Sequence, residues 1–343
     1  AAKWSRRRRA ALGVNGWSCS TMTRTFIVDR FEIDSGAILG TGGFGQVLRA
    51  LDKSSGEVVA AKVIDIKRMR REKVLQEIRL MERVGGHGGV VGLRGAQEVA
   101  ELQQIFIFME LAQEGELFSL VIEKGKLEEP DAVRYFCEMV SAVGYLHEQG
   151  VVHRDLKLEN VLLSSDRCKL CDFGLAHAYD LGPSGEVLRA PLKEVCGSKS
   201  YCAPEVLAGL GYDGGLADMW SLGICLFAML AGFFPLDEAA AQDWRYTRVQ
   251  RSVRMGGSLT QGIFQLYSRP CPMTEEAILL IDELLRLDPE QRCCATDVLS
   301  SPWATATALE PHQKAAVQRQ GVIGLSDEQP SFGSTMPSYE SCG

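Results

Sequence analysis

The chain has 343 residues, of which 46% are hydrophobic and 24% charged, an ordinary composition for a globular protein. Its net charge of −7 argues against nucleic acid as a main partner, because that role usually needs a basic face. No uninterrupted apolar run reaches the roughly 18 residues of a membrane helix, so no membrane span is expected. Eleven cysteines, scattered through apparent core segments, are typical of free thiols in a reducing compartment. This predicts a cytoplasmic protein, and a nuclear location is also compatible.

Composition changes at both ends of the chain. Residues 1–25 contain four consecutive arginines without a following apolar stretch of signal-peptide length, which predicts a disordered basic arm. Residues 305–343 are rich in Ser, Pro and Gln with little apolar periodicity, which predicts a mostly disordered tail. One domain is therefore expected over residues 26–304.

Two kinds of periodicity divide this domain. Residues 26–110 alternate short β-type runs, at 31–33, 58–63 and 105–109, with one charged helical pattern over 67–84. From residue 115 to 304 the pattern is mainly helical, with helices expected at 130–147, 217–231 and 275–287. Turn-forming residues Gln113-Glu114-Gly115 join the two parts. The prediction is an α+β protein with a small β-rich lobe, which carries one helix, and a larger helical lobe.

A glycine-rich run, Gly40-Thr41-Gly42-Gly43-Phe44-Gly45, lies between two strand patterns of the small lobe. Glycines let backbone amides approach phosphate oxygens closely. The same spacing marks dinucleotide folds, but those need a helix directly after the glycines, whereas residues 47–51 continue as a strand. A hairpin that folds over phosphates is therefore favoured. Lys62, inside the next apolar strand, must find an anion, because an unpaired buried ammonium is costly.

Residues 153–174 carry the second chemical pattern, His-Arg-Asp-Leu-Lys-Leu-Glu-Asn followed by Asp-Phe-Gly. Phosphoryl transfer needs a base to orient a hydroxyl, a positive charge for the moving group and oxygen ligands for Mg²⁺. Asp155 and Lys157 offer the first two, and Asn160 and Asp172 offer the ligands. In this order the chain resembles a eukaryotic protein kinase.

The resemblance implies the two-lobed protein kinase fold, with ATP and Mg²⁺ as cofactors. It makes Asp155 the acceptor of the substrate proton, Lys157 and Lys62 catalytic cations, and Asn160 and Asp172 the metal ligands. Lys157 also favours Ser/Thr rather than Tyr substrates. The residues implied around the nucleotide and its cleft are Leu39, Gly40, Thr41, Gly42, Gly43, Phe44, Gly45, Val47, Ala60, Lys62, Glu77, Met109, Glu110, Ala112, Glu116, Glu159 and Leu162.

Three further residues are implied to be structural supports. Glu205, in Ala203-Pro204-Glu205, ends the activation segment and would pair with Arg292, and Asp218 would hold the catalytic-loop backbone. The segment 193–198 resembles the calcium/calmodulin-dependent and AMP-activated kinase group, many members of which have a phosphorylatable Thr where this chain has Glu194. Glu194 would either pair with Arg154 and partly replace a phosphate, or be a solvated loop charge. Both interpretations stay open.

Substrate preference follows from the same resemblance. Glu116 and Glu159 match positions that receive an arginine three residues before the acceptor, whereas a third such acidic position is Ala228 here. Protein substrates with one upstream Arg are therefore expected. Lys199 replaces the usual proline beside the acceptor and leaves the following-residue preference open.

Several alternatives compete with this interpretation. A pseudokinase scaffold or allosteric partner is disfavoured because no catalytic position is missing. The basic amphipathic stretch within 237–272 can bind calmodulin, but a helix and loop of the large lobe is the favoured interpretation. Cys168 and Cys171 have metal-ligand spacing without a second pair, so they are expected on opposite faces of a strand. Cys171 would face the nucleotide, either as an alkylatable or, preferentially, as an inert thiol.

Overall fold

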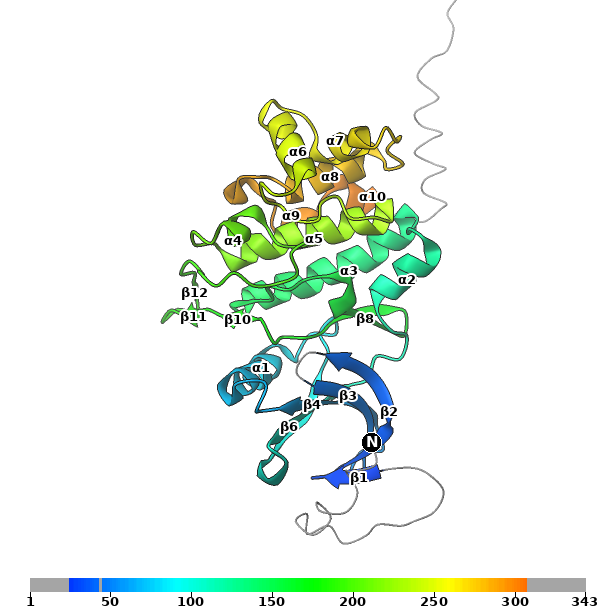
Figure 1. Cartoon of the computed structure of the whole chain (residues 1–343), viewed down its shortest axis with the longest axis vertical. Coiled ribbons are helices and arrows are strands. Elements are labelled where there is room, and N and C mark those ends of the chain that lie inside the picture. Colours follow the sequence, from blue (N-terminus) through cyan, green and yellow to red (C-terminus); the bar gives the residue numbers. More distant parts are fainter. Residues whose placement is uncertain (1–24, 43–44, 307–343) are drawn as a thin grey trace, which may run out of the picture.

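A computed structural model describes residues 25–42 and 45–306. Nearly all of the predicted basic arm and tail lie outside the described residues, as do Gly43 and Phe44. Figure 1 shows a small lobe of strands with one helix next to a larger helical lobe. The predicted α+β, two-lobed architecture is therefore confirmed.

The small lobe is an antiparallel sheet with the strand order β1-β2-β3-β4-β6-β5. Its elements are β1 (Thr25–Val28), β2 (Phe31–Gly42), β3 (Gly45–Asp52), β4 (Val58–Asp65), α1 (Arg71–Val84), β5 (Leu93–Val99), η1 (Ala100–Leu102) and β6 (Gln104–Glu110). One face of the sheet buries a cluster in which Phe31 and Phe108 stack with their ring centroids 3.7 Å apart. The aromatic and β-branched residues that predicted strands thus form this lobe's core.

The helix of the small lobe begins at Arg71, so the predicted start at residue 67 is wrong. The Asp65 side chain accepts the backbone N–H of Lys67, and its carbonyl accepts those of Arg68 and Met69. This hydrogen-bonded turn holds the chain out of helical conformation until Arg70, although the charged pattern starts earlier.

The large lobe contains helices and short strands. They are α2 (Leu117–Lys124), α3 (Glu129–Glu148), β7 (Val151–Val152), η2 (Leu158–Asn160), β8 (Val161–Ser164), β9 (Arg167–Leu170), β10 (His177–Ala178), β11 (Asp180–Leu181), β12 (Val187–Leu188), α4 (Pro204–Ala208), α5 (Gly214–Ala231), α6 (Trp244–Arg254), α7 (Leu259–Leu266), α8 (Glu275–Leu284), η3 (Pro289–Gln291), α9 (Ala295–Leu299) and α10 (Pro302–Ala306).

Two boundaries of the predicted large-lobe helices differ from the structure by three residues, and the ends of α3 differ by one. α5 begins three residues before the predicted start, because Asp213 caps it by accepting the N–H groups of Gly215 and Leu216. α8 ends at Leu284 rather than at residue 287. The apolar pattern continues past this end, but the Arg286 carbonyl is taken by the guanidinium of Arg292.

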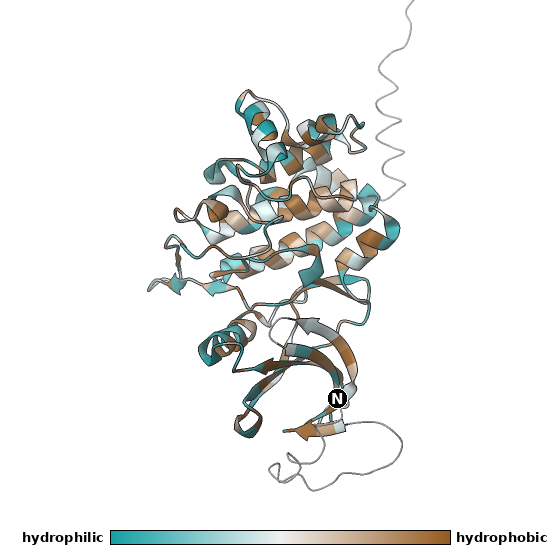
Figure 2. Cartoon of the chain, viewed as in Figure 1, coloured by the Kyte–Doolittle hydropathy of each residue, from teal (hydrophilic) through white to brown (hydrophobic). Residues whose placement is uncertain are grey.

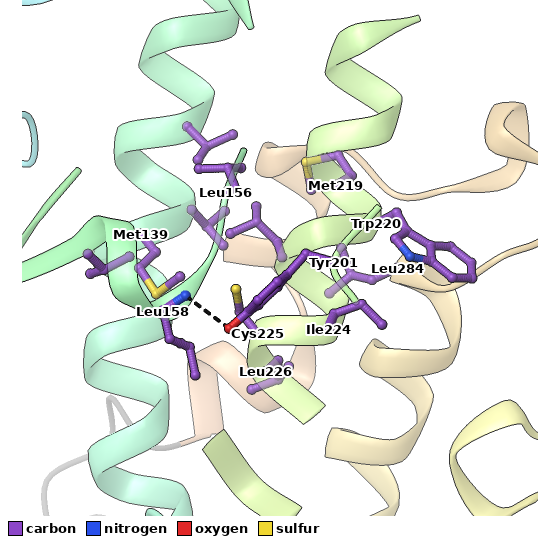
Figure 3. Packing of buried hydrophobic residues seen from close by; sticks show 14 of the residues in the cluster. Met139, Leu156, Leu158, Tyr201, Met219, Trp220, Ile224, Cys225, Leu226 and Leu284 are labelled. Atoms are coloured by element: carbon purple, nitrogen blue, oxygen red, sulfur yellow. Dashed lines mark hydrogen bonds between the residues drawn. The ribbon is translucent and has the colours of Figure 1, made fainter. Parts of the chain in front are cut away.

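Helix α5 forms the centre of the large lobe. Its residues are buried almost throughout, Trp220 and Phe227 completely so, and Figure 2 shows its strongly hydrophobic colouring. The helix is long and apolar enough to span a membrane by composition, but 89% of its apolar window is buried inside the protein. Figure 3 shows side chains of α3, α5 and α8 packed around Tyr201. Packing within the lobe accounts for the apolarity of α5.

The predicted lobe helix within 237–272 is confirmed as α6. Its inner face buries Tyr246 and Val249, and Asp243 caps its first turn by accepting the N–H of Arg245. α7 follows after a short turn.

All nine cysteines among the described residues are free thiols, as expected. Cys168 is buried within β9, and Cys171 follows one residue after the end of that strand. Burial raises the pKa of the Cys171 thiol to about 12, which supports the interpretation as an inert thiol. No group of three or more His, Cys, Asp or Glu side chains within residues 25–42 and 45–306 could hold a metal ion.

A buried ion pair fastens the end of the activation segment to the large lobe, as expected. The Arg292 guanidinium, whose side chain is fully buried, donates to both carboxylate oxygens of Glu205 at 2.6 and 2.8 Å. It also donates to the Leu216 carbonyl and lies over the Trp220 ring. The arginine therefore joins the activation segment, α5 and the α8–α9 connection.

We predict that Arg292→Ala lowers the free energy of unfolding by about 3–5 kcal/mol, because Glu205 would be left partly buried without its cation. Urea unfolding followed by circular dichroism measures this change. Arg286→Ala is the control, since Arg286 is exposed and should change stability by less than about 0.5 kcal/mol. Equal losses in the two variants would contradict the prediction.

Candidate active site

The glycine-rich run forms the predicted hairpin between β2 and β3. Gly40 pairs with Val47, Thr41 with Gln46, and Gly42 with Gly45. A Cβ at Gly45 would collide with the backbone carbonyl of Val63, so only glycine fits where the hairpin crosses β4. The strand after the glycines excludes the dinucleotide-fold alternative. Leu39 on β2 is exposed, and Val47 on β3 is half-buried opposite Gly40.

Lys62 joins side chains from both lobes. Its Nζ lies 2.6 Å from Oε1 of Glu77 on α1 and 3.0 Å from Oδ1 of Asp172 in the large lobe. Burial opposes the ammonium form, but these two carboxylates outweigh it and raise the pKa of Lys62 above its usual range. Lys62 therefore stays protonated. The carboxylates of Glu77 and Asp172 both supply the anion that was expected for it.

The two carboxylates respond differently to their surroundings. Burial raises the pKa of Glu77 above its usual 4.5, an effect that Lys62 opposes. Burial also acts on Asp172, but there the Lys62 ammonium prevails and holds the pKa of Asp172 below its usual range. Asp172 is thus an ionised oxygen donor suited to a hard divalent cation.

Strands β4 and β6 carry the next group of predicted nucleotide-site residues. Ala60 pairs with Met109 across these strands, and both are shielded from solvent, Ala60 almost completely. The Glu110 N–H donates to the Gly92 carbonyl at 2.8 Å. Ala112 and Leu162 are half-buried.

The predicted hinge around Gln113-Glu114-Gly115 is pinned to the β8–β9 hairpin. Glu114 N–H donates to the Leu163 carbonyl, and Leu163 N–H donates to that of Gly115. The Glu114 carboxylate accepts the N–H groups of Ser165 and Asp166 at 2.8 and 3.1 Å. Gly115 has a φ of +80°, which a side chain would disfavour.

Asp218 of α5 holds the catalytic-loop backbone as expected. Its carboxylate is 1% exposed and accepts the N–H groups of His153 and Arg154 at 2.8 and 2.9 Å. His147 Nε2 lies 3.0 Å from the same carboxylate. These bonds stabilise a φ of +64° at Arg154, a conformation that costs energy for a non-glycine residue.

The strained turn places Asp155 among three donors. Asp155 Oδ2 accepts from Lys157 Nζ at 2.7 Å, Oδ1 accepts the Ser198 N–H at 2.8 Å, and the Asn160 amide donates to the Asp155 carbonyl at 2.9 Å. Lys157 also donates to Ser198 Oγ at 3.0 Å. The amide nitrogen of Asn160 is thus occupied, and its oxygen is the end available as a ligand.

The Asp172-Phe173-Gly174 turn is fixed from the same loop. His153 Nε2 lies 3.0 Å from the Cys171 carbonyl, and its ring contacts the buried Phe173 ring at 5.3 Å between centroids. Asp172 has a φ of +62°, a second left-handed non-glycine residue of the site. With Phe173 buried, Asp172 points toward Lys62.

Glu159 and Glu116, the two acidic residues predicted to receive a substrate arginine, differ in their surroundings. Glu159 accepts a hydrogen bond from the Tyr201 hydroxyl at 2.9 Å, and that hydroxyl also accepts the Leu158 N–H at 3.4 Å (Figure 3). Glu116 is exposed. Ala228, at the third position, is 3% exposed within α5.

Glu194 contacts two cations. Its Oε2 lies 3.2 Å from an Arg154 guanidinium nitrogen, one of the two arrangements left open by the sequence, and its Oε1 lies 3.6 Å from Lys73 Nζ on α1. Burial opposes ionisation, but these cations hold the pKa of Glu194 below its usual range. The three side chains line a cavity of about 160 Å³ that also touches Phe173 and Glu77.

Three contact residues of the site were not singled out from the sequence: Lys73, Ser198 and Tyr201. Lys73 precedes Glu77 by one helical turn, and this spacing is a signal that could have placed it on a neighbouring face. Ser198 and Tyr201 lie in the activation segment, where no periodicity marks which side chains turn toward Asp155 and Glu159.

Comparisons with known proteins agree with this geometry. The protein kinase domain family matches residues 33–304. Relatives include CBL-interacting protein kinase 16 of Oryza sativa subsp. japonica, 40% identical over 287 residues, which cover 82% of this chain and 58% of the relative. CBL-interacting serine/threonine-protein kinase 16 of Arabidopsis thaliana is 36% identical, over 83% and 58%. Maternal embryonic leucine zipper kinase of Danio rerio is 34% identical, over 80% and 38%. The chain thus spans little more than half the length of the two plant relatives.

The contacts of Lys62 with Glu77 and Asp172 lead to a prediction about how stability depends on pH. In Lys62→Met, Glu77 stays buried without its cation, so its pKa in the folded protein rises further above 4.5. A folded-state pKa raised above the unfolded value gives stability that is present at low pH and lost as pH rises through this window. The destabilisation relative to the parent chain should therefore grow from about pH 5 to about pH 8 and reach about 3 kcal/mol.

Urea unfolding at several pH values measures the effect. Lys62→Met/Glu77→Leu is the matched control, because it removes both charges and should lose the added pH dependence. If Lys62→Met lowered the free energy of unfolding by the same amount at every pH, ionisation of Glu77 would not be the cause of the loss.

Proposed function

Because the chain belongs to the protein kinase family, we propose that it is a Ser/Thr protein kinase that transfers the γ-phosphoryl group of ATP, with Mg²⁺, to hydroxyls of protein substrates. The observation that carries the proposal is the Lys62 network. One ammonium contacts Glu77 of the small lobe and Asp172 of the large lobe, so the catalytic parts of both lobes are assembled together.

The residues present fit a nucleotide and a divalent metal. The glycine hairpin offers backbone N–H groups to phosphates, and Asn160 and Asp172 offer oxygen ligands of the kind that hard cations bind. When bound, the metal and nucleotide supply the phosphoryl group and neutralise its charge. Lys62 would orient the phosphates while Glu77 holds its ammonium in place.

The acceptor hydroxyl would be oriented by Asp155. Its carboxylate is fixed by Lys157, Ser198 and Asn160, and each oxygen can accept more than one hydrogen bond. A substrate hydroxyl can therefore donate to Asp155 and pass its proton there as the new bond forms. Lys157 lies between Asp155 and Ser198, where its charge would stabilise the transferred group.

Substrates with an upstream Arg are part of the proposal. Glu116 is exposed and Glu159 is half-buried, with one carboxylate oxygen bonded to Tyr201. With Ala228 buried at the third position, one arginine rather than two is the expected requirement. This follows from the resemblance and the placement of these carboxylates.

The activation segment is proposed to be held by Glu194 without phosphorylation. Glu194 reaches Arg154 beside Asp155 and Lys73 one turn before Glu77. A carboxylate at this position would join the activation segment to α1 and to the catalytic loop. A phosphate would make the same connections with more charge.

No observation favours the pseudokinase alternative, since Lys62, Asp155 and Asp172 are all present, Lys62 contacts Asp172, and Asp155 contacts Lys157. Calmodulin is not the expected partner of this chain, and this stays a prediction. The cytoplasmic location is likewise a proposal, supported by the free thiols.

The catalytic proposal is tested by radiolabel transfer from ATP to a basic Ser-containing peptide. Asp155→Asn should lower kcat by about 10²–10⁴-fold, because the acceptor proton loses its base. EDTA should abolish transfer, and added Mg²⁺ should restore it. Asp180→Asn, at an exposed strand position, is the control and should keep nearly full activity. Transfer unaffected by Asp155→Asn would mean that the activity belongs to another protein.

The role of Glu194 is tested by phosphatase treatment and by substitution. Phosphatase-treated enzyme should keep at least half of its activity. Glu194→Ala should lower kcat about fivefold, since two half-exposed ion pairs together contribute about 1 kcal/mol. Glu186→Ala, on the exposed turn of the same segment, should have little effect. If Glu194 is only a solvated charge, both variants will match the parent enzyme.

A further inference from the structure

The outward face of α6 is a cationic surface with apolar ends on an otherwise acidic protein. We call it the α6 arginine face and define it as Trp244, Arg248, Arg251, Arg254 and Met255. Positions 244, 248, 251 and 255 follow helical spacing, so they share one side of the helix. Figure 1 shows α6 at the end of the large lobe that lies farthest from the small lobe.

The arginines of this face have no acidic partner within the described residues. Arg245, on the same helix, pairs with Asp237 and Asp243 and is half-buried. Arg248, Arg251 and Arg254 are exposed, and none forms an ion pair with any residue of the two described ranges. Three unpaired cations on one helix contrast with the net charge of −7 for the chain.

Large apolar side chains frame these cations. Trp244 is 57% exposed and Met255 is 77% exposed, although both are residue types that gain most from burial. The inner face of α6 already anchors the helix through Tyr246 and Val249, so the outer pair is not needed for folding. Exposed Trp, Met and Arg together are the composition of protein interfaces.

The charge pattern identifies the class of partner. Nucleic-acid surfaces are usually much more basic than a chain with a pI of about 5.4. Anionic membranes are held by clusters of roughly four to eight basic residues rather than three. We propose that the α6 arginine face binds an acidic segment of a partner protein. Eleven helical rises separate Trp244 from Met255, about 17 Å, which matches about five extended residues.

The surface is also connected to the substrate side of the active site. Ser200 Oγ donates to the Asp237 carbonyl at 3.1 Å, and Lys199 lies 3.2 Å from Glu238. Asp237 in turn contacts Arg245 at the start of α6. A protein bound to the α6 arginine face would therefore lie beside the loop that contacts the activation segment. The binding itself does not depend on the proposed catalytic activity.

The test uses the full chain and a fluorescein-labelled heptapeptide in which five glutamates lie between two leucines. Fluorescence anisotropy should show saturable binding that weakens with added salt. R248E/R251E/R254E should weaken it at least tenfold, and Trp244→Ala should weaken it severalfold. K67E/R68E/R70E is the matched control, because these exposed cations before α1 give the same change in net charge. It should weaken binding by less than about threefold.

Peptide-kinase activity and thermal unfolding report whether each variant is folded, and both should match the parent chain. Equal weakening in the two triple variants, or absence of saturable binding to the parent chain, would overturn the proposal. Binding to phosphatidylserine vesicles that depends on the three arginines, without binding to the peptide, would also overturn it in favour of a membrane surface. Absence of kinase activity in the parent chain would instead count against the proposed function and would not affect the proposed binding.

Discussion

The buried carboxylate of Asp218 is the constraint on which the active site depends. It lies on the most buried helix of the protein and accepts two consecutive backbone N–H groups of the catalytic loop. A buried carboxylate without such partners would be strongly unfavourable, so α5 and the loop each require the other. The left-handed conformation at Arg154 follows from this bond pair, and it directs Asp155 toward Lys157 and Arg154 toward the activation segment.

The remaining parts of the site are connected through charges. Lys62 links α1 to Asp172, Glu194 links Lys73 of α1 to Arg154, and Arg292 links Glu205 to the core. Each pair joins segments that are far apart in the sequence. The partly exposed Glu194 pairs are the weakest of these, and the fully buried Arg292 pair is the most costly to break. The Glu194 pairs are therefore the contacts between the lobes that a small free-energy change breaks most readily.

Particular residues show how far the sequence could predict the structure. The glycine hairpin was predictable because a short motif specifies it, whereas Glu77 as the partner of Lys62 and Asp218 under the catalytic loop were predictable only through the family resemblance. The start of α1 and the end of α8 were not, since they depend on the N–H groups that Asp65 accepts and on the bond that Arg292 donates to the Arg286 carbonyl. Lys73, Ser198 and Tyr201 were missed because their roles depend on which way the activation segment turns.

The sequence by itself determined the two-lobed class, the order of the catalytic groups and their chemistry, because these depend on residue type and local spacing. Only the tertiary structure decided which charges meet beyond the pairs that the family resemblance implied. It paired Glu194 with two cations and Glu159 with Tyr201, and it left three arginines of α6 without partners. The physical reason is that ion pairs and burial depend on distances between segments, which local pattern does not contain.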